Sequence, residues 1–187
     1  NERMSPVALT GLNIDPQQLA RARAKVTARA GNTIEFVEGD ACRLPFPDSS
    51  FDRVLAVEAI FHFPDRGAYF REVSRVLKPG GRLAVSDFVP VAWISPALWL
   101  NVATRYYGDC DMRCTLQQYR KLAAAHGMRS VIERNVTRHT LPTYAFLRKM
   151  APAMGPIGRD AVKETILLQT MSRLGLLRYS ILAFEKV

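Results

Sequence analysis

Cysteine is scarce in this sequence, and long hydrophobic runs are missing from it. Three cysteines among 187 residues are an odd number, so they cannot form a closed disulfide framework, and a reducing, cytoplasmic setting is expected. Cys110 and Cys114 have no second CxxC pair and no neighbouring histidines, so no metal site is expected. No apolar run has the length of a membrane span, and no secretory leader is visible at the amino terminus.

Acidic residues are few in the second half of the chain. The sequence carries 26 Lys and Arg against 17 Asp and Glu, a formal charge of +9. Residues 1–92 are almost balanced, with 12 basic and 11 acidic side chains, whereas residues 93–187 have 14 and 6. Such an excess favours an anionic partner. The basic residues do not interleave with aromatics as in an RNA-binding module, so nucleic acid is disfavoured, and an RNA methyltransferase stays only an alternative.

The apolar pattern predicts strands that alternate with helices. Asp15-Pro16 and Asp65 are typical helix starts, and the Lys78–Gly81 turn is a typical helix end. This order predicts a doubly wound, mostly parallel α/β sheet, with ligands beyond the carboxyl ends of the strands. The expected strands are residues 7–14, 33–37, 53–57, 83–88, 130–136 and 180–184, and the expected helices are residues 15–31, 65–77, 116–126, 144–154 and 159–174.

The length favours one domain with an insertion rather than two large domains. We expect residues 1–92 to be a partial cofactor-binding core, and residues 93–114 to be a connection that forms a pocket wall. Residues 115–187 are expected to complete the sheet, with a helical lid at about 141–175.

Three segments carry a resemblance to a known family. They are GLNIDPQQLARAR, EGDACRLPFPDSSFDRVLAVEAIFHFPDR and REVSRVLKPGGRLAVSDFV, in this order. They resemble the core of the class I S-adenosylmethionine-dependent methyltransferases, and are most similar to the sterol-type and rebeccamycin-type sugar O-methyltransferases. The resemblance implies a Rossmann-like fold, S-adenosylmethionine as cofactor, and a small-molecule acceptor. It covers roughly the first half of the chain, and the second half matches only in layout.

The resemblance also implies cofactor-binding residues. In the family pattern the residue after the second strand binds the ribose hydroxyls, which here falls on Asn13, with Ile14 beside it and Asp15 as the rival. Gln18 is either a further contact or part of a helix capping box with Asp15.

Two later strand ends complete the expected cofactor site. Asp40 matches the carboxylate that accepts the adenine amino group, with the backbone of Ala41 beside it, and the alternative is an ordinary loop aspartate. Glu58 follows the strand expected beside the methionine portion, although it could instead be an acid at a helix start.

Candidate catalytic residues lie near the same strand ends. His62 matches a histidine proposed as the base of sugar O-methyltransferases, and Asp87 matches an aspartate that closes the pocket and orients base or acceptor. Structural alternatives are a helix-start histidine and a strand-end cap. An acceptor wall is expected from four aromatic side chains, although aromatic residues in such numbers are more often part of a core: Trp93, Tyr106, Tyr107 and Tyr144.

The family's glycine-rich loop and the strand before it have no counterpart in the sequence. In the family this strand lies at the sheet centre, here between the strands at 7–14 and 53–57. The sequence therefore predicts a sheet without its central strand, in a chain that is a fragment of a longer methyltransferase. The alternatives are a non-catalytic fold or assembly module and a homo-oligomer that supplies the strand by exchange.

Overall fold

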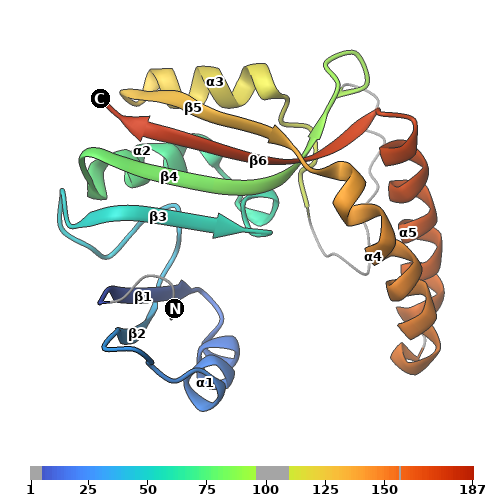
Figure 1. Ribbon diagram of the computed structural model, residues 1–187, viewed down its shortest axis with the longest axis horizontal. Coiled ribbons are helices and arrows are strands. Elements are labelled where there is room, and N and C mark those ends of the chain that lie inside the picture. Colours follow the sequence, from blue (N-terminus) through green and yellow to red (C-terminus); the bar gives the residue numbers. More distant parts are fainter. Residues whose placement is uncertain (1–5, 96–109, 156) are drawn as a thin grey trace.

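The computed structural model describes residues 6–95, 110–155 and 157–187, which form an α/β structure (Figure 1). Its strands are β1 (Ala8–Asn13), β2 (Thr33–Glu38), β3 (Phe51–Val57), β4 (Leu77–Pro90), β5 (Met128–Asn135) and β6 (Leu177–Lys186). Its helices are α1 (Pro16–Lys25), α2 (Arg66–Val76), α3 (Leu116–Ala125), α4 (Thr137–Met150) and α5 (Ile157–Arg173), with short 3-10 turns η1 (Ile60–His62) and η3 (Ala151–Met154). In the described part, no helix is long and apolar enough to span a membrane.

The strands form two separate sheets. β1 and β2 pair in parallel, and the larger sheet has the order β3-β4-β6-β5. β3 and β4 are parallel, whereas β6 is antiparallel to both β4 and β5. β1 and β3 point the same way (Figure 1), so β6 is the reversed strand of a mostly parallel arrangement. The expected α/β class is confirmed.

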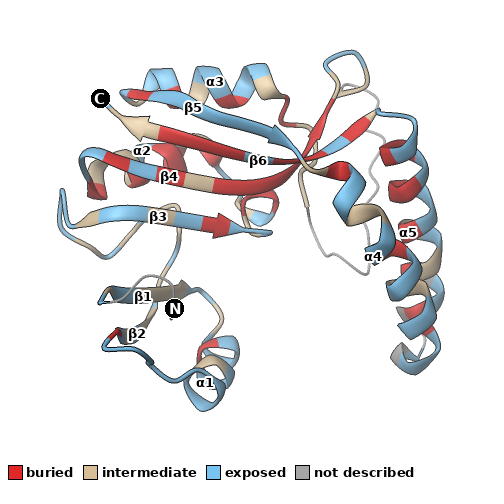
Figure 2. Ribbon diagram, viewed as in Figure 1, coloured by how far each residue is buried: buried red, intermediate tan, exposed pale blue. Residues whose placement is uncertain are grey.

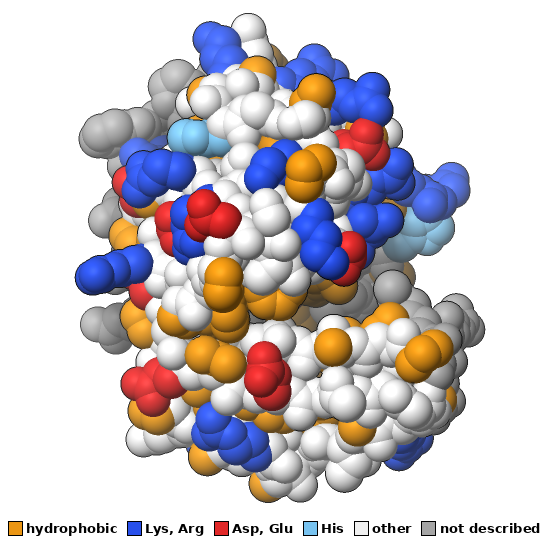
Figure 3. Space-filling model, turned by 90° about the vertical axis from the view of Figure 1, so that its left-hand side faces the viewer, with side chains coloured by type: hydrophobic (Ala, Val, Ile, Leu, Met, Phe, Trp, Pro, Cys, Tyr) orange, Lys and Arg blue, Asp and Glu red, His pale blue; other side chains and the backbone are white. Residues whose placement is uncertain are grey.

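A strand is absent between β1 and β3 in the described part of the chain. β1 pairs only with β2, and β3 pairs only with β4, so each has a free edge. Leu55 and Val57 on β3 are 71% and 70% exposed. Hydrophobic side chains also gather along a hollow between the lower and upper parts of the molecule (Figure 3). The predicted break in the centre of the sheet is thus confirmed.

The main core lies between the larger sheet and the helices α2 and α3. Phe70 and Val73 of α2 and Tyr119 of α3 are fully buried there against Leu83 and Phe184 of the sheet. Burial is concentrated along β4 and β6, whereas β5 is largely exposed and β1 has no buried residue (Figure 2). This core makes β4 and β6 the rigid support of the residues at their ends.

The helices α4 and α5 pack on the end of the sheet through a second apolar cluster. Tyr144 of α4 and Leu168 and Met171 of α5 are buried there with Phe88 and Tyr179 of the sheet. The two helices form an antiparallel pair that is joined to β5 and β6 (Figure 1).

Two helix boundaries were predicted wrongly. The first helix ends at Lys25 and not at Gly31, because the β-branched Val26 and Thr27 follow and have poor helix propensity. The helix α4 begins at Thr137 and not at residue 144, because Asn135 Oδ1 accepts hydrogen bonds from both the amide and the hydroxyl of Thr137. The helix then continues through Pro142.

The loop before β3, which contains the LPFPDSS motif, is held by α2. Arg75 donates to the carbonyls of Leu44 and Phe46 over 2.9 and 2.7 Å and pairs with Asp48 at 2.8 Å. Glu72 accepts the Leu44 amide at 3.0 Å and also pairs with Arg75. These bonds fix the loop that leads from β2 to β3.

Candidate functional site

The carboxyl ends of β1, β2 and β3 carry polar residues at the same edge of the structure. Asn13 is the last residue of β1, Asp40 lies just beyond β2, and Glu58 lies just beyond β3. Parallel strands bring their carboxyl ends to one edge, which is where α/β sheets bind ligands. Three of the predicted cofactor residues are therefore placed on one side of the molecule.

Asn13 and Asp15 form different hydrogen bonds at the end of β1. Asp15 is the N-cap of α1, and its Oδ1 accepts the Gln17 amide at 2.8 Å. Asn13 Oδ1 accepts the Asp15 amide at 2.9 Å, which leaves the Asn13 amide group as a donor. The cap thus engages Asp15, whereas the amide group of Asn13 keeps its donors for another partner.

Gln18 and Ile14 are exposed beside this turn. The Asp15 side chain bonds Gln17 and not Gln18, and the described bonds of the α1 cap include none from the Gln18 side chain. The amide of Gln18 is therefore available to a ligand. Ile14 is 69% exposed and offers an apolar surface next to it.

Asp40 stabilises its own loop with one carboxylate oxygen. Its Oδ1 accepts the Cys42 amide at 2.8 Å, and its backbone forms an isolated bridge with Arg43. This Asx-type turn fixes Asp40 and leaves its second oxygen as an acceptor. Ala41, the predicted backbone contact, is half-buried in the same turn.

Glu58 has an unusual backbone and two polar partners. Its φ of +50° lies in the left-handed region, which is costly for a residue with a side chain. The Glu58 amide donates to Ser86 Oγ at 3.1 Å, and the Tyr179 hydroxyl donates to Glu58 Oε1 at 2.8 Å. The Tyr179 and Ser86 hydroxyls are 3.0 Å apart. Strands β4 and β6 thus hold the residue at the end of β3.

His62 lies close to Glu58 in sequence, on the turn η1, and is exposed. Its ring centroid is 4.5 Å from that of Phe61, which is buried and belongs to the second apolar cluster. The Phe61 carbonyl accepts the Asp111 amide at 2.7 Å. These contacts fix the turn, and the imidazole remains accessible from solvent.

Asp87 is fully buried on the face of the sheet that carries α2 and α3. Its carboxylate accepts hydrogen bonds from the Tyr119 hydroxyl and, at 2.7 Å, from the Phe88 amide. Arg66 Nη2 lies 3.7 Å away, and Arg66 Nη1 pairs with Asp111 at 2.8 Å. Asp87 is therefore part of an interior network and does not face Glu58, whose partner Ser86 points to the other face.

Burial dominates the electrostatics of this network. It raises the pKa of Asp87 to about 6, although bonds from Tyr119 and the charge of Arg66 act against the shift. Burial also raises the pKa of Tyr119 well above its ordinary value. Burial likewise opposes the ionisation of Asp111, but bonds from Arg113 and the nearby Arg66 lower its pKa to about 2.

The predicted aromatic wall is only partly gathered. Trp93 is 73% exposed, whereas Tyr144 is buried in the second apolar cluster with its hydroxyl 3.4 Å from Ser172 Oγ. Tyr106 and Tyr107 lie outside the described residues.

Sequence reasoning missed Ser86, Tyr179 and Arg66. Ser86 and Tyr179 face each other across neighbouring strands far apart in sequence, so no local motif marks them. Arg66 follows a helix cap and reads as an ordinary first-turn residue.

Comparisons with known proteins relate the sequence of this chain to methyltransferases. Residues 2–85 match the protein-family model described as a methyltransferase domain. Methyltransferase GfsG of Streptomyces halstedii is 33% identical over 174 residues, which is 87% of this chain and 60% of that protein. The 27-O-demethylrifamycin SV methyltransferase of Amycolatopsis mediterranei is 45% identical over 92 residues, which is 49% of this chain and 33% of that protein. The chain thus spans between a third and three fifths of the length of these two relatives.

Solved structures share the fold. Mycolic acid cyclopropane synthase CmaA1 superposes with a TM-score of 0.75 at 14% identity, covering 96% of this chain and 74% of that one. Geranyl diphosphate C-methyltransferase from Streptomyces coelicolor, solved with S-adenosyl-L-homocysteine, has a TM-score of 0.69 at 17% identity, covering 98% and 71%. The chain therefore has the fold and the amino-terminal sequence of the class I S-adenosylmethionine-dependent methyltransferases.

Proposed function

We propose that the protein transfers a methyl group from S-adenosylmethionine to a small-molecule acceptor. The observation that carries this proposal is the convergence of Asn13, Asp40 and Glu58 at the carboxyl ends of three strands in a chain whose residues 2–85 match a methyltransferase domain. Relatives with sterol, rifamycin and menaquinone in their names support a small organic acceptor. We also propose that the protein acts in the cytoplasm.

The free polar groups of these residues fit the cofactor. The ribose needs a hydrogen-bonding side chain, and the Asn13 amide and Gln18 are available. The adenine amino group needs an acceptor beside an apolar surface, which the second oxygen of Asp40 and the side chain of Ile14 provide, with the Ala41 amide adjacent. The second oxygen of Glu58 is free to accept from the amino group of the methionine portion.

When bound, S-adenosylmethionine supplies an electrophilic methyl group, so the protein's work is orientation and proton removal. Methylation of a hydroxyl releases a proton, and His62 is placed to accept it at its exposed imidazole. Asp87 acts indirectly in this proposal. It helps to hold Arg66, which pairs with Asp111, and the Asp111 amide fixes the Phe61 carbonyl next to His62.

The acceptor pocket is proposed at the junction of the sheet end with α4 and α5. Tyr144 contributes to its floor within the second apolar cluster, and Trp93 is available at the exposed rim. We also propose Tyr106 and Tyr107 as part of this pocket wall. The proposed division of the chain is a core of residues 1–92, a connection of residues 93–114 and a terminal part of residues 115–187.

Catalysis in this proposal requires a further strand between β1 and β3, since Asn13 and Glu58 belong to sheets that are not joined in the described part. The test is calorimetric titration of S-adenosyl-L-homocysteine into the 187-residue chain and into a longer chain that includes such a strand. We expect the longer chain to bind, and Asp40→Asn to weaken binding about tenfold. Absence of binding by both would refute the proposal. Methylation by the 187-residue chain alone would refute the need for the extra strand.

A further inference from the structure

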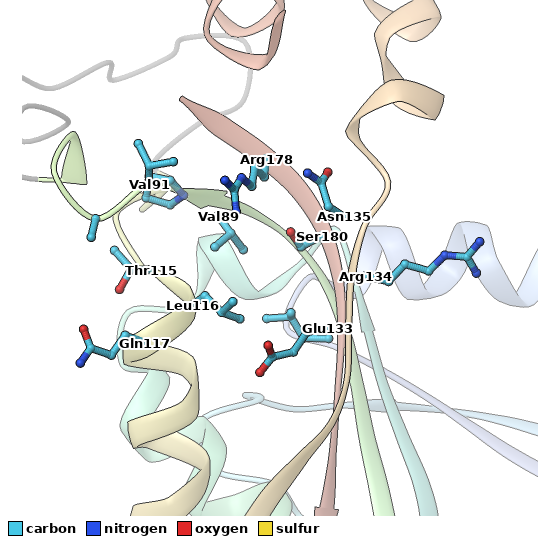
Figure 4. Close-up of a pocket in the computed structure, with 13 residues that line it drawn as sticks. Val89, Val91, Thr115, Leu116, Gln117, Glu133, Arg134, Asn135, Arg178 and Ser180 are labelled. Carbon is cyan, nitrogen blue, oxygen red and sulfur yellow. The ribbon is translucent and has the colours of Figure 1, made fainter. Parts of the chain in front are cut away.

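A second pocket lies on the opposite face of the sheet from Glu58. It has a volume of about 320 Å³ and is formed by β4, β5, β6 and the start of α3 (Figure 4). Arg178, Ser180 and Leu182 of β6 line it. Tyr179, between the first two, points to the other face and contacts Glu58. This pocket is therefore separate from the proposed cofactor site.

Two arginines that line the pocket, Arg134 and Arg178, have no ion pair among the described residues, and the Arg134 guanidinium points away from the pocket (Figure 4). Arg178 is therefore the unpaired charge that a ligand in the pocket would meet. Glu133, also on the wall, is paired with Arg120. Asp87, next to Ser180 across the strands, is covered by Tyr119 and lies near Arg66. Each nearby carboxylate thus has its own arginine. The positive charge of Arg178 is left uncompensated at the mouth of the pocket.

Ser180 is a second observation in favour of a binding site, and it does not depend on the charge of Arg178. Its side chain is only 6% exposed, yet its hydroxyl has no hydrogen-bond partner among the described residues. The hydroxyl is not one of the fully enclosed polar atoms without a partner, so it opens onto the pocket, where it is free to bond a ligand. Figure 4 shows Ser180 on the sheet wall, facing the space between the sheet and α3.

The start of α3 supplies the opposite wall. Thr115 caps the helix by accepting the Gln118 amide, whereas the amides of Leu116 and Gln117 have no partner within the described residues. Free amides at a helix start attract negative charge. Val89, Val91 and Leu116 make the remaining wall apolar.

We propose that this pocket binds a small organic anion, with its carboxylate or phosphate between Arg178, Ser180 and the start of α3, and its apolar body against Val89 and Leu116. The volume corresponds to about ten water-sized groups, which suits a ring with one charged substituent. The proposal does not depend on the methyltransferase function, because none of these residues belongs to the proposed cofactor or acceptor site.

The test uses 4-fluorobenzoate and 4-fluorophenyl phosphate as anionic probes and 4-fluorobenzamide as the neutral one, followed by fluorine NMR with the full chain. We expect both anions, or one of them, to bind at least tenfold more tightly than the amide. The comparison of the two anions tells carboxylate from phosphate recognition. Arg178→Gln should weaken anion binding at least tenfold, and Ser180→Ala at least threefold.

Arg134→Gln is the matched control, since Arg134 is on the neighbouring strand β5 but its guanidinium points away from the pocket (Figure 4). This variant should bind within twofold of the parent chain. Equal losses in the Arg178 and Arg134 variants would show that only net charge matters, and would overturn the proposal. So would unchanged binding by Arg178→Gln, absence of binding by the parent chain, or displacement of the probe by saturating S-adenosyl-L-homocysteine. Thermal unfolding of each variant confirms that it is folded.

Discussion

The hydroxyl of Tyr179 donates a hydrogen bond to Oε1 of Glu58 over 2.8 Å, although 121 positions separate the two residues in the chain. Tyr179 is also bound through its backbone. Its amide donates to Thr137 Oγ1, and its carbonyl accepts the Val136 amide, each at 2.9 Å. One residue of β6 therefore connects the start of α4 with the strained end of β3.

Removal of the Tyr179 hydroxyl should weaken cofactor binding. In Tyr179→Phe the carboxylate of Glu58 loses a fixed donor, and we expect the Kd for S-adenosyl-L-homocysteine to rise about tenfold in a chain that binds it. Titration calorimetry measures this effect. In a Glu58→Gln background the same substitution should have less than a threefold effect, because the two residues act as one unit.

Tyr144→Phe is the control for this substitution. Tyr144 belongs to the same apolar cluster, but its hydroxyl is 3.4 Å from Ser172 and does not bond Glu58. We expect its cofactor Kd to stay within twofold of the parent value. Equal effects of the two tyrosine variants, or additive effects of Tyr179→Phe and Glu58→Gln, would show that Tyr179 does not position Glu58.

The buried carboxyl of Asp87 should make stability depend on pH. Burial raises its pKa from 3.8 to about 6 in the folded chain. The folded state then binds a proton more tightly than the unfolded state. This stabilising contribution is complete below about pH 4 and is lost as the pH rises through about 6. It amounts to about 3 kcal/mol in the free energy of unfolding.

Asp87→Asn should abolish this contribution. Urea unfolding at about pH 4 and about pH 7 gives the difference in free energy between the parent and the variant. We expect that difference to change by about 2–3 kcal/mol between the two conditions. Asp52→Asn is the control, since Asp52 is exposed and pairs with Lys78 on the surface. A change of the same size in both variants would contradict the assignment to Asp87.

Arg66 should be important for stability. It is 8% exposed, pairs with Asp111 at 2.8 Å and lies 3.7 Å from Asp87. Arg66→Met leaves the buried Asp87 without its counter-ion, whereas Asp111 keeps its pair with Arg113, and we expect a loss of about 3 kcal/mol in the free energy of unfolding at neutral pH. In an Asp87→Asn background the loss should be smaller, because the carboxylate that Arg66 compensates is already gone. Losses that simply add would show that Arg66 and Asp87 are energetically independent.

The exposed face of β3 should promote self-association of the 187-residue chain. Leu55 and Val57 are 71% and 70% exposed there, beside a free strand edge. The double variant Leu55→Lys and Val57→Lys should sediment more nearly as a monomer. Its free energy of unfolding should change by less than about 1 kcal/mol, since the two side chains have little contact to lose. A loss of several kcal/mol would instead show that these residues are packed.

Much of the fold could be predicted because its signals are local. Asp65 caps α2 by accepting the Ala68 amide, as the sequence indicates. Gly80 has the positive φ, +72°, that the sequence predicts, but it lies within β4, which begins at Leu77 and not at residue 83. The break beside β1 was predictable from the absent glycine-rich segment. The start of α4 was not, because it depends on the side chain of Asn135, which accepts bonds from the amide and the hydroxyl of Thr137.

The site was less predictable because its contacts join distant strands. Asn13, Asp40 and Glu58 follow strands that the apolar pattern reveals, so their common edge could be inferred. Tyr179 and Ser86 contact Glu58 only when β4 and β6 are paired. The pairing of two strands cannot be predicted from the sequence of either strand alone. The burial of Asp87 likewise results from α3, whose Tyr119 covers it.

The amino-terminal part of the chain should open independently of the larger sheet. Within the described residues, the hydrogen bonds of β1 and α1 stay among residues 7–39, and the loop fixed by Arg75 leads from there to the larger sheet. Such a part opens as a cooperative unit of its own, so its amides should exchange with solvent before those of β4 and β6. A ligand that contacts both Asn13 and Glu58 would hold this part against the larger sheet and reduce its opening. Slower amide hydrogen exchange in β1 would therefore be a direct sign of ligand binding.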